Sequence, residues 1–278
     1  MDTHDVTSSR DRSSSDETVS LVRTGALPQE TLGSVTNELV ARLARRIPAQ
    51  SSALPGLLAP ADPGELDAFC ETLISEDVSY ARSFFQALRT RGMTTDRLCL
   101  SYLAPAARRL GEDWNADRLG CLEVTLGSAR LHSLLRTMHS DFSPRAMHYR
   151  PELTAVMAAV PGETHVLGVT MAANFFRRAG WHVDLQCDPD ADMLCALAAS
   201  GQYRLVGLSA GCESVYENLK SLVHRLRKQA PDVKIALAGN LIAMEPGIVD
   251  ELGADASAMD VSVAPSSLER LVLTYIKS

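Results

Sequence analysis

The sequence predicts two successive folds: a helical bundle, followed by an α/β region built on a five-stranded parallel sheet. Residues 65–142 are rich in Leu and Ala with few prolines, whereas from residue 153 onward short apolar runs alternate with helical stretches. That alternation is typical of a doubly wound sheet with helices on both faces. The chain has 278 residues, and the usual domain size of about 100–200 residues also favours more than one domain.

The N-terminal part is expected to stay outside both folds. Residues 1–27 are rich in Ser, Thr, Asp and Arg and have few apolar anchors, so we predict a disordered tail. Residues 29–46 carry apolar side chains at helical spacing, which predicts an amphipathic helix. The prolines and glycines that follow exclude regular structure up to residue 64, so residues 28–64 are interpreted as a helix and a linker.

The helical bundle is predicted over residues 65–142. Breaks at Gly92 and around 113–117 separate four helices, expected at 65–75, 78–91, 95–112 and 118–139. Short connections favour antiparallel neighbours, as in a four-helix bundle. Residues 143–152 then form a linker.

The α/β region is predicted over residues 152–278. Strands are expected at 154–160, 182–187, 204–209, 233–238 and 255–259, and helices at 167–179, 191–200, 214–229, 243–252 and 265–276. We expect the flavodoxin-like strand order 2-1-3-4-5, a Rossmann-like arrangement. Ligands of such sheets bind beyond the carboxyl ends of the strands.

Composition excludes several classes of function. A net charge of −7 with mixed signs argues against direct nucleic-acid binding. The six cysteines lack paired zinc-site spacing, so we interpret them as reduced core residues. Neither a signal peptide nor a membrane-spanning run is recognisable, so we expect a cytoplasmic protein that does not bind a membrane.

The loop after the first strand carries the most informative residues, Glu163 and His165. A carboxylate two residues before a histidine can hold one ring nitrogen and leave the other basic enough to bind a metal. Gly168 lets a large group approach the backbone. The alternative is a loop histidine that hydrogen-bonds only its neighbours.

Two further loops are expected at the same edge of the sheet. Ser209 and Ala210 follow the third strand and Gly239 follows the fourth, and their small side chains leave room for a long ligand. The Ser209 hydroxyl could donate to that ligand or to Glu163. These loops could equally be tight turns of an empty flavodoxin-like domain.

The stretch Glu163-Thr164-His165-Val166-Leu167-Gly168 resembles the cobalamin-binding signature Asp-x-His-x-x-Gly. The resemblance implies that His165 is the lower cobalt ligand and that the three loops hold the nucleotide tail of adenosyl-, methyl- or hydroxocobalamin. The family carries Ser-x-Leu and Gly-Gly where this chain has Ser209-Ala210-Gly211 and Ala238-Gly239.

The stretch from Leu103 to Leu131, with Trp114 near its middle, resembles the helical cap of bacterial cobalamin photoreceptors, in which a tryptophan covers the upper corrin face. Repressors of the CarH/LitR type continue with Trp-x9-Glu-His, but here the last two positions are Val124 and Thr125, which excludes that histidine switch. This variant resembles the AerR/PpaA antirepressors over roughly residues 65–278. Trp114 could instead be a core anchor.

The resemblance implies a light-responsive antirepressor that binds cobalamin and acts through a CrtJ/PpsR-type repressor of photosynthesis genes. A haem-binding sensor and a corrinoid carrier for a methyltransferase remain alternatives. We find no independent catalytic constellation and expect no enzyme activity. His132 lies on the predicted cap helix and is a candidate upper cobalt ligand, with a solvated position as the alternative.

Overall fold

The computed structural model describes residues 60–143 and 150–276. The predicted tail and almost all of the helix and linker at 28–64 lie outside these residues. The first described helix, α3 (Pro63–Ile74), starts within the predicted linker. It begins there because Asp62 accepts a hydrogen bond from the backbone N–H of Glu65 at 3.1 Å and because Pro63 suits the first helical position.

The predicted helices of the first region are present. They are α4 (Val78–Thr90), α5 (Thr95–Arg97), η1 (Leu98–Leu103), α6 (Ala104–Asn115), α7 (Cys121–Thr137) and the short η2 (His139–Phe142). The expected helix at 95–112 is a continuous run of α5, η1 and α6, with π-helical bonding in its middle. Pro105 lacks a backbone N–H, and the adjacent N–H of Ala104 bonds to the carbonyl of Cys99 instead of the usual partner.

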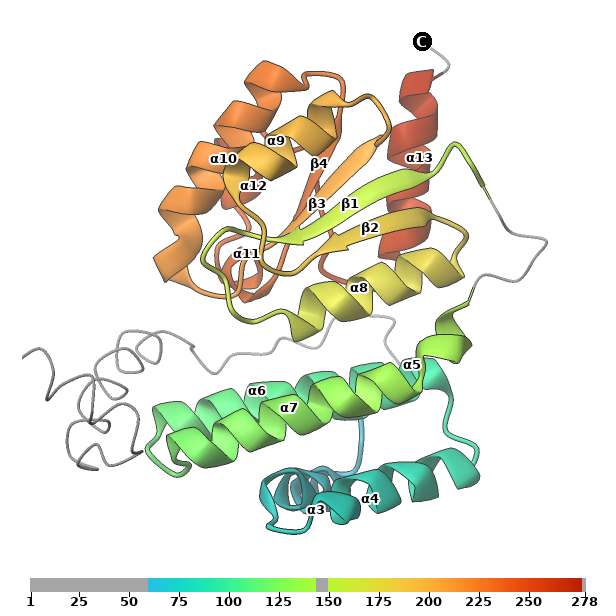
Figure 1. Cartoon of the computed structure of the whole chain (residues 1–278), viewed down its shortest axis with the longest axis vertical. Helices are drawn as coiled ribbons and strands as arrows, with labels where there is room; N and C mark the ends of the chain where they lie inside the picture. Colours follow the sequence, from blue (N-terminus) through green and yellow to red (C-terminus); the bar gives the residue numbers. More distant parts are fainter. Residues whose placement is uncertain (1–59, 144–149, 277–278) are drawn as a thin grey trace, which may run out of the picture. The chain divides into compact units, whose positions relative to one another are not determined.

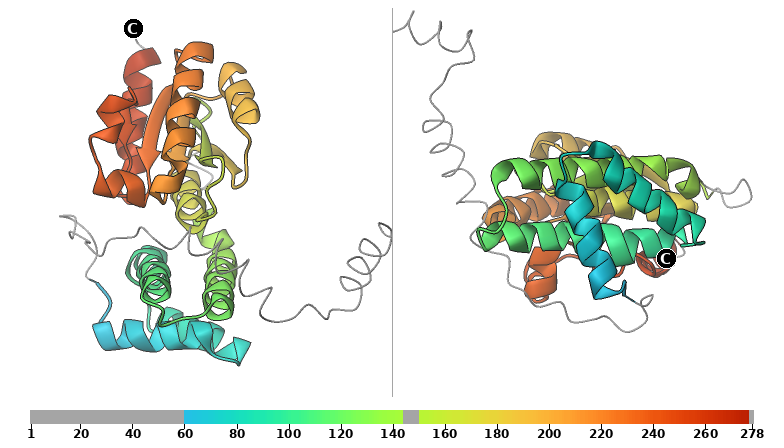
Figure 2. Two further views of the ribbon diagram at one scale, coloured as in Figure 1. Left: turned by 90° about the vertical axis from the view of Figure 1, so that its left-hand side faces the viewer. Right: turned by 90° about the horizontal axis from the view of Figure 1, so that it is seen from below.

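A core of aromatic and aliphatic side chains holds these helices together. Phe69 of α3 lies at its centre, with ring centroids 5.5 Å from Phe84 and 6.1 Å from Tyr102. Gly127 lets α7 approach α6, since a Cβ there would lie 2.7 Å from Leu110 Cδ1. In Figure 2, α3 crosses the α6–α7 pair, so the helices are not antiparallel neighbours throughout.

The second region is a five-stranded parallel sheet with strand order β2-β1-β3-β4-β5, which confirms the predicted topology. The strands are β1 (Thr154–Ala159), β2 (His182–Gln186), β3 (Leu205–Ser209), β4 (Lys234–Ala238) and β5 (Ala256–Ser257). Each begins within two residues of its predicted start. The buried runs of β1 and β3 have the near-continuous apolar character of strands covered on both faces.

Helices cover both faces of the sheet (Figure 1). The first face packs against α8 (Leu167–Arg178) and α13 (Ala264–Ile276), and the second against α9 (Ala191–Ala199) and α10 (Tyr216–Gln229). Alternate residues of β1 point to opposite faces of the sheet, so that Met157 packs into the hydrophobic core on the first face and Val156 into the core on the second.

The prediction of a single helix at 243–252 is wrong in detail. Two short helices, α11 (Asn240–Met244) and α12 (Ile248–Glu251), take its place. Pro246 lies between them and disfavours helical backbone at the residue before it. The first begins directly after β4, next to Gly239, and thereby shortens the predicted loop.

Contacts also join the two regions. Phe142 of η2 packs on Phe175 of α8, with ring centroids 5.7 Å apart. Arg178 pairs with Asp96 and lies over the Phe175 ring, 4.7 Å from its centroid. Among the described helices, none is both long and apolar enough to span a membrane.

Candidate functional site

The loop between β1 and α8 is fixed at the carboxyl edge of the sheet. The backbone N–H of Val160 donates to the carbonyl of Ser209 at 3.0 Å, so the loop starts beside the end of β3. Gly162 has a φ of +85°, a conformation that favours glycine and lets the chain turn back. The N–H of Glu163 then bonds to the carbonyl of Val160 at 2.8 Å. This turn directs Glu163 into the protein.

The carboxylate of Glu163 connects two loops. Its side chain is 1% exposed. Oε1 accepts the backbone N–H of His165 at 2.8 Å and lies 2.6 Å from His165 Nδ1. Oε2 accepts the backbone N–H of Gly211, on the loop after β3, at 2.5 Å. Gly211 therefore supplies this hydrogen bond to Glu163, which was one of the two possible uses expected for the Ser209 hydroxyl. Ser209 is still the last residue of β3.

Gly211 can make this contact because it has no side chain. A Cβ at residue 211 would lie 2.8 Å from Glu163 Oε2 and 3.3 Å from His165 Nδ1. The leucine of the related signature would therefore displace the carboxylate. The absence of a side chain at residue 211 is therefore what lets the buried Glu163 carboxylate lie against this loop.

Glu163 holds the Nδ1 nitrogen of His165, and more than half of the His165 side chain is exposed to solvent. Its side chain is 54% exposed although its partner is buried. Hydrogen bonds with the Cys212 thiol and the Glu163 carboxylate raise the pKa of His165 to about 10. Burial acts to raise the pKa of Glu163, but its bonds with His165 and Gly211 outweigh this and lower it. Since Nδ1 is held by the carboxylate, Nε2 is the nitrogen suited to a metal.

Cys212 is the site residue that the sequence reasoning missed. We interpreted it as a core cysteine, and at 8% exposure it is buried. Its Sγ nevertheless lies 4.0 Å from Glu163 Oε2 and 3.0 Å from Ser214 Oγ, and the hydrogen bond with His165 lowers its pKa. The signal was its place three residues after Ser209, in a loop expected beside Glu163.

The loops after β3 and β4 also lie side by side, as predicted. Ala210 is fully buried, and its N–H donates to the carbonyl of Ala238 at 2.9 Å. Gly239 has a φ of +105°, and a Cβ there would lie 2.2 Å from the Ala210 carbonyl oxygen. Backbone packing thus requires Gly239 whether or not a ligand binds. Gly168 differs, because a Cβ there would meet nothing within 4 Å.

The remaining predicted residues lie in the helical region. Trp114 is the next-to-last residue of α6, is half-buried, and is not one of the described residues that form the helical core. On α7, Val124 is half-buried and Thr125 is exposed, with its hydroxyl bonded to the Cys121 carbonyl at 2.7 Å. His132 is half-buried, and desolvation, together with Arg136, lowers its pKa. These residues share the α6–α7 pair and not the Glu163 loop.

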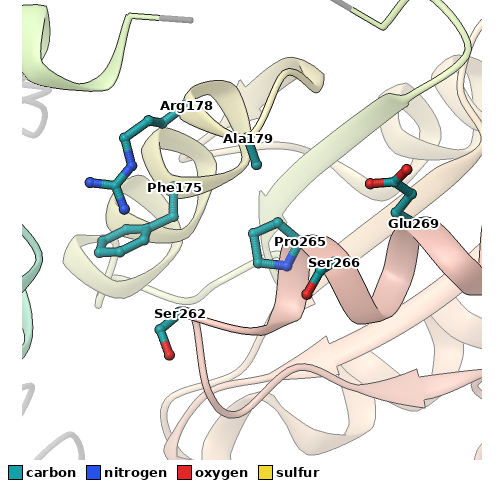
Figure 3. A pocket seen from close by; sticks show the side chains of 7 residues that line it. All are labelled: Phe175, Arg178, Ala179, Ser262, Pro265, Ser266 and Glu269. Atoms are coloured by element: carbon teal, nitrogen blue, oxygen red, sulfur yellow. The ribbon is translucent and has the colours of Figure 1, made fainter. Parts of the chain in front are cut away.

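A separate small cavity of about 190 Å³ lies between α8 and the start of α13 (Figure 3). It contains none of the predicted site residues. Its two charged side chains are already paired, Arg178 with Asp96 and Glu269 with Arg150. We assign it no role in ligand binding.

Comparisons with known proteins agree with this geometry. Residues 153–262 match the family model described as the B12 binding domain. An uncharacterized 20.5 kDa protein in the bchF-crtJ intergenic region of Rhodobacter capsulatus is 25% identical over 183 residues, which are 66% of this chain and 95% of that protein. The monomethylamine corrinoid protein of Methanosarcina barkeri superposes with a TM-score of 0.65 at 16% identity, over 76% of this chain and all of that one. That likeness establishes a shared fold.

Proposed function

We propose that this protein is a light-responsive, cobalamin-binding regulator that acts as an antirepressor on a CrtJ/PpsR-type repressor of photosynthesis genes. The observation that carries the proposal is the Glu163–His165 pair, in which a buried carboxylate orients an exposed imidazole. The pair lies at the carboxyl edge of the sheet, within the segment that matches the B12 binding domain.

The residues present fit the cofactor. His165 offers a neutral-nitrogen ligand once it loses its proton, and Glu163 fixes the ring orientation. The open space beside Gly168 leaves room for a bulky group against the backbone. Bound alkylcobalamin would supply the light sensitivity, because illumination breaks its cobalt–carbon bond. Trp114, Val124, Thr125 and His132 are proposed to face the upper side of the corrin.

The regulatory part of the proposal rests on the AerR/PpaA resemblance and on gene position. The name of the Rhodobacter capsulatus relative places its gene next to crtJ, whose name is that of the expected partner. A ligand changes partner binding only through its different affinities for two states of the protein. We expect about 1–3 kcal/mol of coupling, a several-fold to hundredfold change in repressor affinity.

Reconstitution tests the cofactor. The purified protein is titrated separately with hydroxocobalamin, adenosylcobalamin and haemin, and absorption spectra are recorded in the dark and after light. We expect stoichiometric corrinoid binding that His165→Ala largely removes while the circular dichroism stays unchanged. A haem spectrum without corrinoid binding would favour the haem sensor.

Calorimetry with a CrtJ/PpsR-type repressor tests whether light changes the affinity of the protein for this partner. The protein loaded with adenosylcobalamin is measured in the dark and after illumination, and His165→Ala is measured in parallel. We expect the repressor affinity to differ between the dark and light states and the variant to show no light effect. Equal affinity in all three samples would contradict the regulatory role and favour a corrinoid carrier.

A further inference from the structure

Three different metal-binding groups converge on one point at the carboxyl edge of the sheet. Glu163, His165 and Cys212 each offer a ligand atom, and these atoms lie within 4.8 Å of one another. A carboxylate oxygen, an imidazole nitrogen and a thiol sulfur form a mixed donor set. Carboxylate, imidazole and thiolate are the three ligand types that Zn²⁺ uses in proteins.

The group is built into the fold and is not a chance cluster of surface charges. Glu163 is 5% exposed and Cys212 is 8% exposed, and the two come from loops that follow different strands. Gly211 joins the loops through its bond to Glu163 Oε2, and a Cβ at that residue would collide with the carboxylate. The side chain of His165 remains open to solvent. A metal ion would therefore have three protein ligands and an outer position for water.

The ligand atoms lie within 4.8 Å of one another, so some separations would have to shrink by up to about 1.2 Å around a small metal ion. Tetrahedral zinc with bond lengths of about 2.0–2.3 Å places its ligand atoms about 3.3–3.6 Å apart. The sulfur of Cys212 lies 4.0 Å from Glu163 Oε2, slightly beyond this range. His165 Nδ1 lies 2.6 Å from Oε1, because a proton now bridges the two atoms. Exchanging that proton for the ion would open the pair by less than about 1 Å.

We propose that Glu163, His165 and Cys212 form a Zn²⁺ site in the cobalamin-free protein. The carboxylate and the thiolate together balance the charge of the ion, which is otherwise costly to bring next to buried groups. Zinc bound at Nδ1 would replace the hydrogen bond by which Glu163 orients the ring for cobalt at Nε2. That last consequence, unlike the site itself, rests on the proposed function.

The test uses metal ions alone with the full-length, chelator-treated protein. Zn²⁺ is titrated by calorimetry into the parent, Cys212→Ser and Cys187→Ser. Cys187 is the matched control, a half-buried cysteine just after β2 whose Sγ lies 3.9 Å from Thr170 Oγ1, outside the three-residue group. We expect one Zn²⁺ per chain, an affinity lowered by at least about tenfold in Cys212→Ser, and no change in Cys187→Ser.

Co²⁺ substitution in the parent protein gives a second readout that does not depend on the folding of a variant. We expect a thiolate-to-cobalt charge-transfer band in the near ultraviolet at one equivalent of metal. Absence of that band, absence of zinc binding, or parental zinc affinity in a folded Cys212→Ser would overturn the proposal. Hydroxocobalamin binding is measured separately on metal-free protein, so failure of the zinc site and failure of cobalamin binding are distinguishable.

Discussion

One oxygen of Glu163 binds His165 twice, through the backbone N–H at 2.8 Å and through Nδ1 at 2.6 Å. The same carboxylate fixes the loop and the orientation of the ring. Its second oxygen is bound by the N–H of Gly211, 48 residues further along the chain. The buried carboxylate of Glu163 therefore sets the position of the exposed imidazole. The carboxylate is itself held by hydrogen bonds from the loop after β1 and from the loop after β3.

Glu163→Gln should weaken hydroxocobalamin binding by about 10–100-fold, the usual effect of losing a carboxylate that orients a metal-binding histidine. The amide keeps the volume but loses the negative charge that supports the ring. Absorption titration measures the affinity. The matched control is Glu217→Gln on the exposed surface of α10, which should bind like the parent. Parental affinity in Glu163→Gln would show that the pair does not support the cofactor.

Gly211→Ala should also weaken cobalamin binding, because its Cβ would lie 2.8 Å from Glu163 Oε2 and push the carboxylate away from His165. Gly247→Ala is the control, since a Cβ there would meet nothing within 4 Å and its φ is −60°. Both variants are compared with the parent by corrinoid titration and thermal melting. Equal corrinoid affinity in all three proteins would contradict the coupling of Gly211 to His165.

Trp114→Ala should change the preference between adenosylcobalamin and hydroxocobalamin more than it changes stability, because Trp114 is half-buried and lies outside the helical core. The chain's other tryptophan provides the comparison. Trp181 is 3% exposed and packs on Phe176 with ring centroids 5.2 Å apart, so Trp181→Ala should cost about 3–5 kcal/mol. A large loss of stability in Trp114→Ala with unchanged selectivity would make Trp114 a core anchor.

Asp255 should make stability depend on acidic pH. Burial acts to raise its pKa, but bonds from Arg227, the Ile235 N–H and Lys234 outweigh it and hold the pKa below the ordinary 3.8. A lowered folded-state pKa stabilises the protein above the unfolded-state pKa, and this contribution is lost as pH falls through the folded-state value.

Denaturant melts between neutral pH and pH 3 should therefore show a smaller decline in the free energy of unfolding for Asp255→Asn than for the parent. At neutral pH the variant should be less stable by about 1–3 kcal/mol, since the ion pairs of Asp255 with Arg227 and Lys234 are lost. Asp188→Asn, at an exposed residue, should follow the parent. Parallel pH profiles for Asp255→Asn and the parent would refute the assignment.

The parallel sheet and the positions of its strands could be predicted because buried parallel strands read as short apolar runs separated by helical sequence. The strand order was expected because it is the order of flavodoxin-like sheets. The same reasoning placed Glu163, Ser209 and Gly239 at one edge of the sheet. Position alone put Cys212 in the loop after the third strand, but its residue type did not mark it as part of the site, since a cysteine among apolar residues looks the same whether it fills a core or lies beside a histidine. The sequence also could not show that Gly211 binds the carboxylate, because that bond depends on how two loops pack.

The helix predicted at 243–252 failed for a local reason, the break at Pro246. The roles of Trp114, Val124, Thr125 and His132 stay predictions. These four residues lie on α6 and α7. The spacing of apolar residues predicts that a helix forms, but it does not predict what the surface of that helix binds.

The most direct test of the central claim is electron paramagnetic resonance of cob(II)alamin bound to protein labelled with ¹⁵N-histidine. If His165 binds cobalt, each cobalt line should show the doublet splitting of ¹⁵N, should change to a triplet in unlabelled protein, and should lose the doublet in His165→Ala. A triplet that persists in the labelled protein would mean that the cofactor keeps its own benzimidazole nitrogen, and would contradict the assignment of His165 as the lower ligand.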